Sequence, residues 1–423
     1  MGKIVTLGLT LVVSLFMFIG CGGGLSEPAN EVVSGGELVV SFSGESLKAS
    51  LIDKNVTGID ANTTVYGYKA YKIPYTTTDE EGNSVAVSGL MVVPTGLPDI
   101  VYSTLGLSLV SDDHGTIFGN REAPSVIAST NNTPDGSPII LTSLGGFVTI
   151  QPDYIGFGDS LNHYHPFILK KSLANATVDF IAAARVFATN NNINLNGQLF
   201  LTGYSEGGYA AMATLEKIET EGVLTVAMAA PMAGPYTVEG LATTVLQDAN
   251  LSVPSFMANV GFAYAKAYSQ DIANVINEPY ASSLERLFNG DLIRTEIDPQ
   301  LTIQTTGANG LFAQAFVTDV LTNVNNWFRV ASRANDVFKW VPQTPVKLVH
   351  CIGDDVIPYN ISVVTNTTMN SLGAPNVSLV PVEVAVTGDP GTALRYGHGA
   401  CGSVAYSVTT NIFAGVRAAT IGY

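Results

Sequence analysis

The amino-acid sequence predicts an α/β fold with a mostly parallel central sheet and helices on both faces. From about residue 100 onward, short apolar stretches typical of strands alternate with longer stretches of helical spacing. The chain is 46% hydrophobic and only 13% charged, which is ample material for a buried core. Residues 239–341 break the alternation with a mainly helical pattern, which predicts a cap inserted over one edge of the sheet.

The size and charge of the chain limit its function. A length of 423 residues fits one large α/β domain that carries insertions. The formal net charge is −16, from 35 acidic and 19 basic residues. Such a balance repels phosphate backbones, so nucleic acid is not an expected partner. The sequence indicates no oligomeric state.

The N-terminus predicts export. Lys3 precedes an apolar run over residues 4–19 that is short for a membrane span, so residues 1–20 are expected to be a signal peptide. An uncleaved anchor helix is the alternative. Phe-Ile-Gly-Cys at residues 18–21 resembles a bacterial lipobox, in which Cys21 is lipidated, and the glycine after it is similar to the outer-membrane sorting pattern. We expect a lipoprotein at the outer membrane or cell surface, whose only membrane contact is this anchor, with residues 21–45 as a flexible tether.

The elements follow in order from residue 65. Two strands over residues 65–73 and 85–93 flank a turn-like stretch, which predicts a hairpin. The further expected strands are residues 107–110, 146–150, 199–202, 223–230, 346–349 and 377–384, and the expected core helices are residues 173–188, 207–218 and 404–418. The α/β core is therefore expected over residues 46–238 and 342–423.

The expected cap over residues 239–341 is rich in bulky apolar side chains. The alternative to a cap is that these side chains fill a second small core. They are Phe262, Tyr264, Phe288, Phe312, Phe316, Trp327 and Phe328.

A Gly-x-Ser-x-Gly pattern at residues 203–207 identifies Ser205 as the candidate nucleophile. It follows the strand over residues 199–202 and precedes the helix from residue 207. This context resembles the nucleophile elbow of α/β hydrolases, where a strained turn exposes the serine hydroxyl above the sheet. Its glycines leave room where a Cβ would collide. The alternative is a structural turn with an incidental serine.

A serine nucleophile needs a general base, and histidine is the usual one. The five histidines are His114, His163, His165, His350 and His398. The chain order of nucleophile, acid and base in this type of fold leaves the last two. His350 precedes the best acid candidates, whereas His398 is expected in a glycine-rich loop after the last strand and before the last helix. We therefore choose His398 as the base, and assign no chemistry to His163 or His165.

The acid that orients the base is expected after the strand over residues 346–349. Asp354 and Asp355 both follow it. Hydrolases of this fold commonly place an aspartate four residues before a proline such as Pro358, which favours Asp354. Asp355 stays the reserve, and one of the two is expected to be only a turn residue.

The three cysteines are Cys21, Cys351 and Cys401. If Cys21 carries lipid, the other two remain as a pair in an oxidising compartment. Cys351 lies three residues before Asp354 and Cys401 three after His398, so a disulfide would tie the acid loop to the base loop. Two buried free thiols are the alternative.

Two backbone N–H groups are expected to form the oxyanion hole. One belongs to Glu206, directly after the nucleophile, and the other to the loop after an early strand. His114-Gly115-Thr116 fits that loop, with Thr116 as the donor and His114 holding the loop.

The ordered set of motifs resembles the secretory lipase family of α/β hydrolases and its bacterial lipoprotein relatives, over about residues 65 to 420. The motifs are Asp-His-Gly-Thr at 113–116, Pro-Asp-Tyr-Ile-Gly-Phe-Gly-Asp-Ser at 152–160, His-Pro-Phe at 165–167, Gly-Tyr-Ser-Glu-Gly-Gly-Tyr-Ala-Ala at 203–211, Cys-Ile-Gly-Asp-Asp-Val-Ile-Pro-Tyr at 351–359 and His-Gly-Ala-Cys at 398–401.

The resemblance implies hydrolysis of carboxylic esters or lipids through an acyl-enzyme, a helical cap, and no cofactor or metal. Two alternatives stay open. The first is a serine aminopeptidase on the same fold, in which Glu206 would bind the substrate amine. The second is a non-catalytic surface lipoprotein with a hydrolase scaffold.

Overall fold

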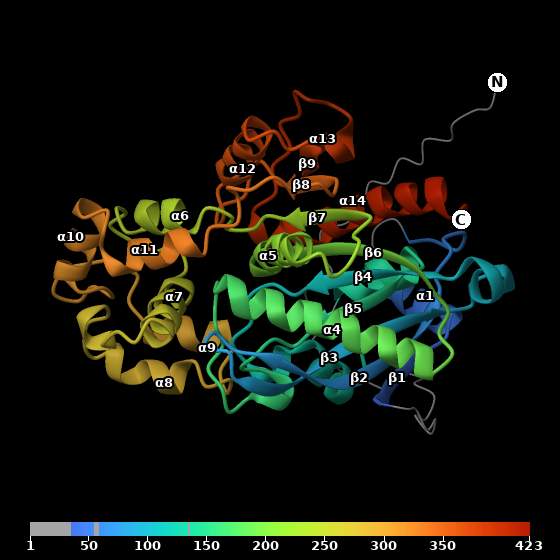
Figure 1. Ribbon diagram of the computed structural model, residues 1–423, viewed down its shortest axis with the longest axis horizontal. Coiled ribbons are helices and arrows are strands. Elements are labelled where there is room, and N and C mark those ends of the chain that lie inside the picture. The colour runs from blue at the N-terminus through green and yellow to red at the C-terminus, as the bar shows by residue number, and fades with distance from the viewer. Residues whose placement is uncertain (1–34, 55–58, 134–135) are drawn as a thin grey trace.

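A computed structural model of the chain describes residues 35–54, 59–133 and 136–423 (Figure 1). The expected signal peptide, the lipobox and Cys21 lie outside the described residues. Within those ranges, no helix has the length and apolar character needed to cross a membrane.

The described residues form one nine-stranded sheet in the order β1-β2-β3-β5-β4-β6-β7-β8-β9. The antiparallel strands β1, β2 and β3 lie at one edge, and β3 also pairs antiparallel with β5. From β5 to β9 every pairing is parallel. The strands are β1 (Glu37–Phe42), β2 (Gly67–Thr78), β3 (Ser84–Thr95), β4 (Leu107–Asp113), β5 (Val148–Pro152), β6 (Leu195–Tyr204), β7 (Met228–Met232), β8 (Val346–His350) and β9 (Val377–Pro381).

Helices cover both faces of the sheet (Figure 1). Helices α4 and α5 lie in front of it in this view, and α14 lies behind. The helices are α1 (Gly44–Asp53), α2 (Pro124–Asn131), α3 (Gly136–Pro138), α4 (Lys170–Asn190), α5 (Glu206–Glu221), α6 (Val238–Val245), α7 (Pro254–Ala267), α8 (Leu284–Leu287), α9 (Arg294–Ile297), α10 (Gln314–Thr322), α11 (Trp327–Ala334), α12 (Asn360–Ser371), α13 (Val382–Thr387) and α14 (His398–Thr420).

The central strand β6 shows why the core has two layers. Successive side chains of a strand point to opposite faces. Leu199 and Leu201 accordingly pack into the apolar cluster that contains α4 and α5, whereas Phe200 packs into the cluster that contains α14. The Phe200 ring stacks on Phe413 with their centroids 4.5 Å apart. The apolar run at residues 199–201 therefore places this part of β6 in the middle of the fold.

The segment between β7 and β8 contains α6 to α11 and lies at one end of the sheet (Figure 1). Its aromatic side chains belong to the same apolar cluster as α4 and α5 and do not fill a separate core; of those expected, only Trp327 is partly exposed. Two buried tyrosines link this segment to the core. Tyr264 Oη donates to the carbonyl of Ile168 at 3.0 Å, and Tyr209 Oη of α5 donates to the carbonyl of Asn335 at 2.8 Å.

The hairpin and most of the alternating elements are confirmed, but the tether prediction is wrong over its last part. Residues 37–42 form β1, which pairs with β2, and residue 44 begins α1. Leu38 and Val40 are buried, so this short apolar alternation is a strand. The surrounding Gly, Ser and Glu residues hide the pattern in the sequence.

Two expected strand boundaries are also wrong. The strand expected over residues 377–384 ends at Pro381, and residues 382–387 turn into α13. The β-branched residues there favour a strand, but tertiary contacts of Glu383 override that propensity. The strand expected over residues 223–230 is shifted, since β7 spans Met228–Met232.

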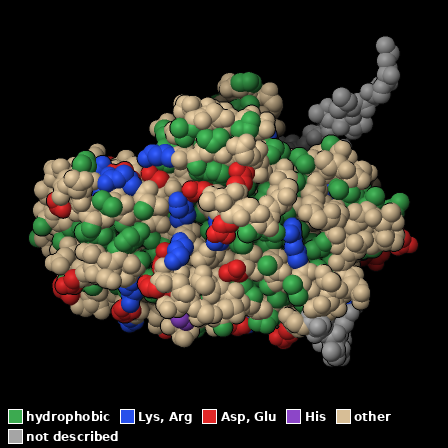
Figure 2. All heavy atoms as spheres, in the orientation of Figure 1, with side chains coloured by type: hydrophobic (Ala, Val, Ile, Leu, Met, Phe, Trp, Pro, Cys, Tyr) green, Lys and Arg blue, Asp and Glu red, His purple; other side chains and the backbone are tan. Residues whose placement is uncertain are grey.

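Charged side chains of both signs are interspersed on the face seen in Figure 2, and hydrophobic side chains are scattered between them. Two of the ion pairs join neighbouring elements. Lys170 of α4 lies 3.3 Å from Glu216 of α5, and Arg333 of α11 lies 2.6 Å from Glu239 of α6. Such partly exposed pairs contribute little stability, about 0 to 1 kcal/mol each.

Candidate active site

Ser205 lies in a sharp turn between β6 and α5. Its φ of 61° and ψ of −119° place a non-glycine residue in a sparsely populated region of backbone space. The Ser205 N–H donates to the carbonyl of Met232 at the end of β7, at 2.9 Å, and the Ser205 carbonyl accepts from Tyr209 N at 3.2 Å. These two bonds hold the strained turn on the neighbouring strand and on the first turn of α5.

The turn requires glycine where α5 meets the sheet. A Cβ added to Gly207 would lie 1.8 Å from the carbonyl oxygen of Asp113, and one added to Gly208 would lie 2.2 Å from that of Met232. No side chain fits at either distance, because both obstacles are backbone atoms of neighbouring strands. The glycines therefore let α5 begin directly at the carboxyl ends of β4 and β7.

Ser205, His398 and Asp354 meet at the carboxyl ends of β6 and β8. Ser205 Oγ lies 2.9 Å from His398 Nε2, and His398 Nδ1 lies 2.7 Å from Asp354 Oδ2. A carboxylate only accepts, so Nδ1 carries the proton and Nε2 is free to accept from the serine hydroxyl. His398 is the first residue of α14, so its expected place in a loop is wrong. The glycines around it are compatible with a helix start as well as with a loop.

Asp354 is completely buried as a side chain, yet its carboxylate is well supplied with donors. Oδ1 accepts from the N–H groups of Val356 and Ile357, at 3.0 and 2.8 Å. Oδ2 faces His398 and also His350 Nε2, at 3.3 Å. Burial by itself raises the pKa of Asp354, but the hydrogen bonds from His350 and His398 outweigh it and hold the pKa well below its usual value. Asp354 is therefore ionised under ordinary conditions.

Asp355, the reserve candidate, has a different contact with the same histidine. It is exposed, and its Oδ1 accepts the backbone N–H of His398 at 2.8 Å. A carboxylate at this position caps the first turn of α14 and interacts favourably with the helix dipole. The expectation that one of the two aspartates is only a turn residue is therefore wrong.

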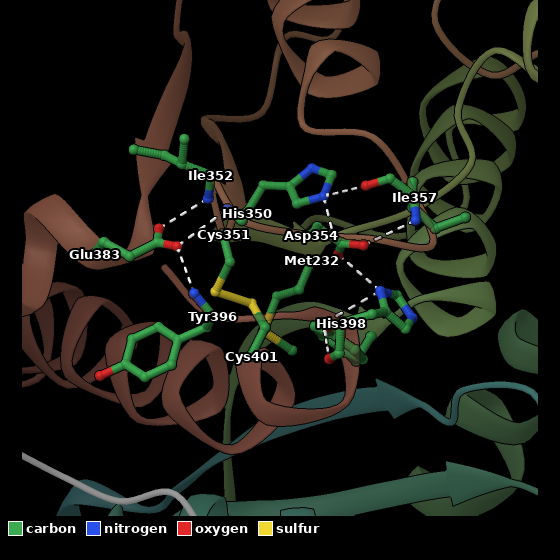
Figure 3. Close-up of a disulfide and its surroundings, with 12 residues drawn as sticks. Met232, His350, Cys351, Ile352, Asp354, Ile357, Glu383, Tyr396, His398 and Cys401 are labelled. Carbon is green, nitrogen blue, oxygen red and sulfur yellow. Dashed lines mark hydrogen bonds and ion pairs between the residues drawn. A yellow bond between two sulfur atoms is a disulfide. The ribbon is translucent and has the colours of Figure 1, made fainter. Parts of the chain in front are cut away.

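Two further links join the acid loop to the start of α14 (Figure 3). Cys351 and Cys401 form a disulfide, as expected from the sequence. On the other side, the buried carboxylate of Glu383 accepts N–H groups from both segments: Ile352 at 2.8 Å, Gly353 at 3.2 Å and Tyr396 at 3.1 Å. Asp354 and His398 are thus held by a covalent and a polar link.

The loop expected to complete the oxyanion hole adjoins Ser205. A Cβ added to Gly115 would lie 3.0 Å from the carbonyl oxygen of Tyr204 and 3.8 Å from Ser205 Cβ. His114 is buried, with Nδ1 2.8 Å from the carbonyl of Gly115, so it fixes this loop from within. Thr116 follows Gly115 and is half-buried.

The side chain of Glu206 points into the protein. It is 1% exposed, and its Oε1 lies 2.8 Å from Nε2 of the buried His165. His165 Nδ1 lies 2.9 Å from the carbonyl of Ile155, so the pair connects the first residue of α5 to the loop after β5.

Three residues near Ser205, Asp354 and His398 have partners that sequence reasoning missed. They are His165, His350 and Glu383. Their polar character in apolar surroundings was the available signal. Their partners, however, come from other elements of the fold, and no local pattern encodes them. Over residues 35–54, 59–133 and 136–423, no group of three or more His, Cys, Asp or Glu side chains is arranged to hold a metal ion.

The chain is also similar to known proteins. Residues 129–386 match the model of the secretory lipase family. Among the curated proteins, none matches.

Several solved structures share the fold. A Legionella pneumophila protein described as a hydrolase superposes with a TM-score of 0.78 at 22% identity, over 92% of this chain and 98% of that one. The rice cell wall degrading esterase LipA from Xanthomonas oryzae gives 0.73 at 23% identity, with the same coverage. Candida antarctica lipase A gives 0.57 at 17% identity, over 78% of this chain and 73% of that one. The predicted fold class is confirmed.

Proposed function

Because the chain belongs to the secretory lipase family of α/β hydrolases and is a carboxylic-ester hydrolase, we propose that Ser205, His398 and Asp354 are its catalytic triad. One observation carries the proposal. The Ser205 hydroxyl, the His398 imidazole and the Asp354 carboxylate form a continuous chain of contacts at 2.9 and 2.7 Å. Through these contacts a proton can pass from the hydroxyl to the imidazole, while the carboxylate stabilises the resulting positive charge on His398.

The reaction proceeds in two acyl-transfer steps. Ser205 Oγ attacks the ester carbonyl carbon while His398 Nε2 takes the hydroxyl proton. The N–H groups of Glu206 and Thr116 stabilise the oxyanion, and the alcohol leaves with the proton from His398. Water then attacks the acyl-enzyme, His398 takes its proton, and the carboxylic acid leaves as the proton returns to Ser205. The strained backbone of Ser205 holds its Oγ beside the base in both steps.

The aminopeptidase alternative receives no support from Glu206. A residue that binds a substrate amine must face the substrate, whereas the Glu206 carboxylate is buried against His165. We therefore expect hydrolysis of p-nitrophenyl esters and no comparable hydrolysis of aminoacyl anilides.

The helical segment over residues 239–341 is proposed to act as the cap over the acyl-binding side of the site. It carries many buried aromatic residues and lies at the end of the sheet. Rates on an ester series from acetate to palmitate measure its selectivity. A preference for long chains defines a lipase, and activity confined to short chains defines an esterase.

Membership of a secretory family fits export, and we propose that the exported protein is anchored by lipid on Cys21 at the outer membrane or cell surface. The test is incorporation of labelled fatty acid in a bacterial host. Labelling should be lost in Cys21→Ala, and a variant that labels like the parent chain would contradict the anchor.

The triad proposal is tested with Ser205→Ala. The variant lacks the attacking oxygen, so kcat for a p-nitrophenyl ester should fall by a factor on the order of 10⁴ or more. The free energy of unfolding serves as the control and should change little, since the deleted hydroxyl is small. Near-parental kcat in a folded Ser205→Ala protein would refute the proposal.

A further inference from the structure

We propose that His350 is a positioning residue of the site: a second imidazole donor to Asp354 that weakens the interaction of the Asp354 carboxylate with His398. The inference rests on the proposed triad. Figure 3 shows Asp354 between the two imidazole rings. His398 approaches Oδ2 from the start of α14, and His350 approaches the same oxygen from the end of β8.

The surroundings of His350 determine the proton on Nε2. This nitrogen lies 3.0 Å from the carbonyl of Ile357 and 3.3 Å from Asp354 Oδ2, and both oxygens only accept. Nε2 therefore carries a proton and donates to this pair. The ring is fully buried, so water does not compete for the donor.

The contact of His350 Nδ1 is compatible with two protonation states of the ring. Both states predict the same effect on the charge of Asp354. Nδ1 lies 2.7 Å from Oγ of Ser362, a buried residue of α12. If Ser362 donates, His350 is neutral; if Ser362 accepts, His350 is a cation. In either state the N–H or the positive charge draws negative charge on Asp354 toward His350 and away from His398.

The position of the Asp354 carboxylate does not depend on His350 alone. Oδ1 stays anchored by two backbone N–H groups, from Val356 and Ile357. Loss of His350 should therefore leave Asp354 in place but strengthen its interaction with His398. The protonated form of His398 would then be stabilised, so the neutral base would form only at a higher pH.

Few other titratable groups face the two rings within the described part of the chain. The Tyr359 ring lies edge-on to His350 with centroids 5.6 Å apart. Tyr204 Oη contacts the His398 carbonyl at 2.7 Å, and Asp355 contacts the His398 N–H. The contacts of Tyr204 and Asp355 with His398 do not involve His350.

The experiment compares His350→Leu, which removes the donor, with His350→Gln, whose amide keeps an N–H near the position of Nε2. The readout is kcat/KM for a p-nitrophenyl ester between about pH 5 and pH 9, where protonation of the base inactivates the enzyme. In His350→Leu the acidic limb should move up by about 0.5 to 1 pH unit. In His350→Gln the limb should stay near its parental position.

Three outcomes would overturn the inference: an unmoved limb in His350→Leu, a limb that moves to lower pH, or equal shifts in both variants. If His350→Leu does not fold, Ser362→Ala decides, because loss of the Nδ1 partner should move the limb in the same direction by less. An unmoved limb there contradicts the inference as well. Full activity of Ser205→Ala would instead overturn the triad, so the two failures are distinguishable.

Discussion

Asp354 and Asp355 are adjacent and chemically identical, yet the fold gives them different partners. The first contacts the imidazole of His398 from a buried position, and the second caps the helix that begins with His398. We therefore predict that Asp354 controls the protonation of the His398 imidazole, and that Asp355 supports the start of the helix that carries His398.

Asp354→Asn should therefore lower kcat by about 10⁴-fold, because an amide can present a donor to Nδ1 and stabilise the wrong tautomer of His398. Asp355→Asn is the matched control. Its amide oxygen still accepts from the His398 N–H, so kcat should fall by less than about tenfold. Both values come from steady-state kinetics on one ester. Equal losses in the two variants would contradict the assignment of the acid.

The contact between Ser205 and His398 could be expected from the sequence, because each residue is marked locally. A glycine-flanked serine between a strand and a helix is typical of a nucleophile elbow, and chain order removes the competing histidines. Glu383, His165 and His350 carry no such mark. Each owes its role to a contact from another element, which becomes readable only when β5, β8 and α13 are placed around the site.

At the scale of elements, β8, α13 and α14 act as one unit around Asp354 and His398. The disulfide spans 50 residues of sequence and joins the loop after β8 to the first turn of α14. In the chain-entropy model, closing a loop of this length contributes up to about 4 kcal/mol. The link therefore stabilises the protein and also limits how far Asp354 and His398 can separate.

The double substitution Cys351→Ala and Cys401→Ala tests both effects. The free energy of unfolding in urea should fall by about 2 to 4 kcal/mol. The kcat should fall by about tenfold or more, because the acid and the base lose a shared restraint. Denatured, unreduced parent protein should show neither cysteine alkylated by mass spectrometry. Parental stability and kcat in the double variant would show that the link is dispensable.

Elements that contain a clearly apolar, buried stretch were predictable, and elements without one were not. The buried part of strand β6 and the buried first half of helix α5 have such a stretch, and both elements were located to within a few residues. The boundary between β9 and α13 falls inside a β-branched run, where contacts of Glu383 decide the structure. β1 is a short edge strand whose partner comes from a separate part of the chain.

At the scale of the whole molecule, the parallel strands converge on a site that also buries unusual polar groups. Asp113 ends β4 and is fully buried, with Oδ1 accepting from Thr177 Oγ1 at 2.6 Å. Burial raises the pKa of Asp113 well above its ordinary value, and the neighbouring charge of Asp112 adds to this. Between the ordinary pKa and the raised one, the folded state therefore binds a proton that the unfolded chain has released.

The direction in which folding stability changes with pH follows from this extra proton on the folded state. Stability from Asp113 is fully present below the unfolded pKa of about 3.8 and is lost as the pH rises toward the folded pKa. Asp113→Asn removes this loss. Relative to the variant, the parent protein should lose up to about 1.4 kcal/mol of stability per pH unit over that window. Urea unfolding of both proteins at several pH values measures it, and a difference independent of pH would contradict a raised pKa.

The central claim is that Ser205 is the nucleophile activated by His398 and Asp354. The most direct test is treatment of the folded protein with a fluorophosphonate probe, followed by peptide mapping by mass spectrometry. We expect one adduct, on the peptide that contains Ser205, with no labelling of Ser205→Ala and much slower labelling of His398→Ala. An adduct on another residue, or undiminished labelling of Ser205→Ala, would contradict the claim.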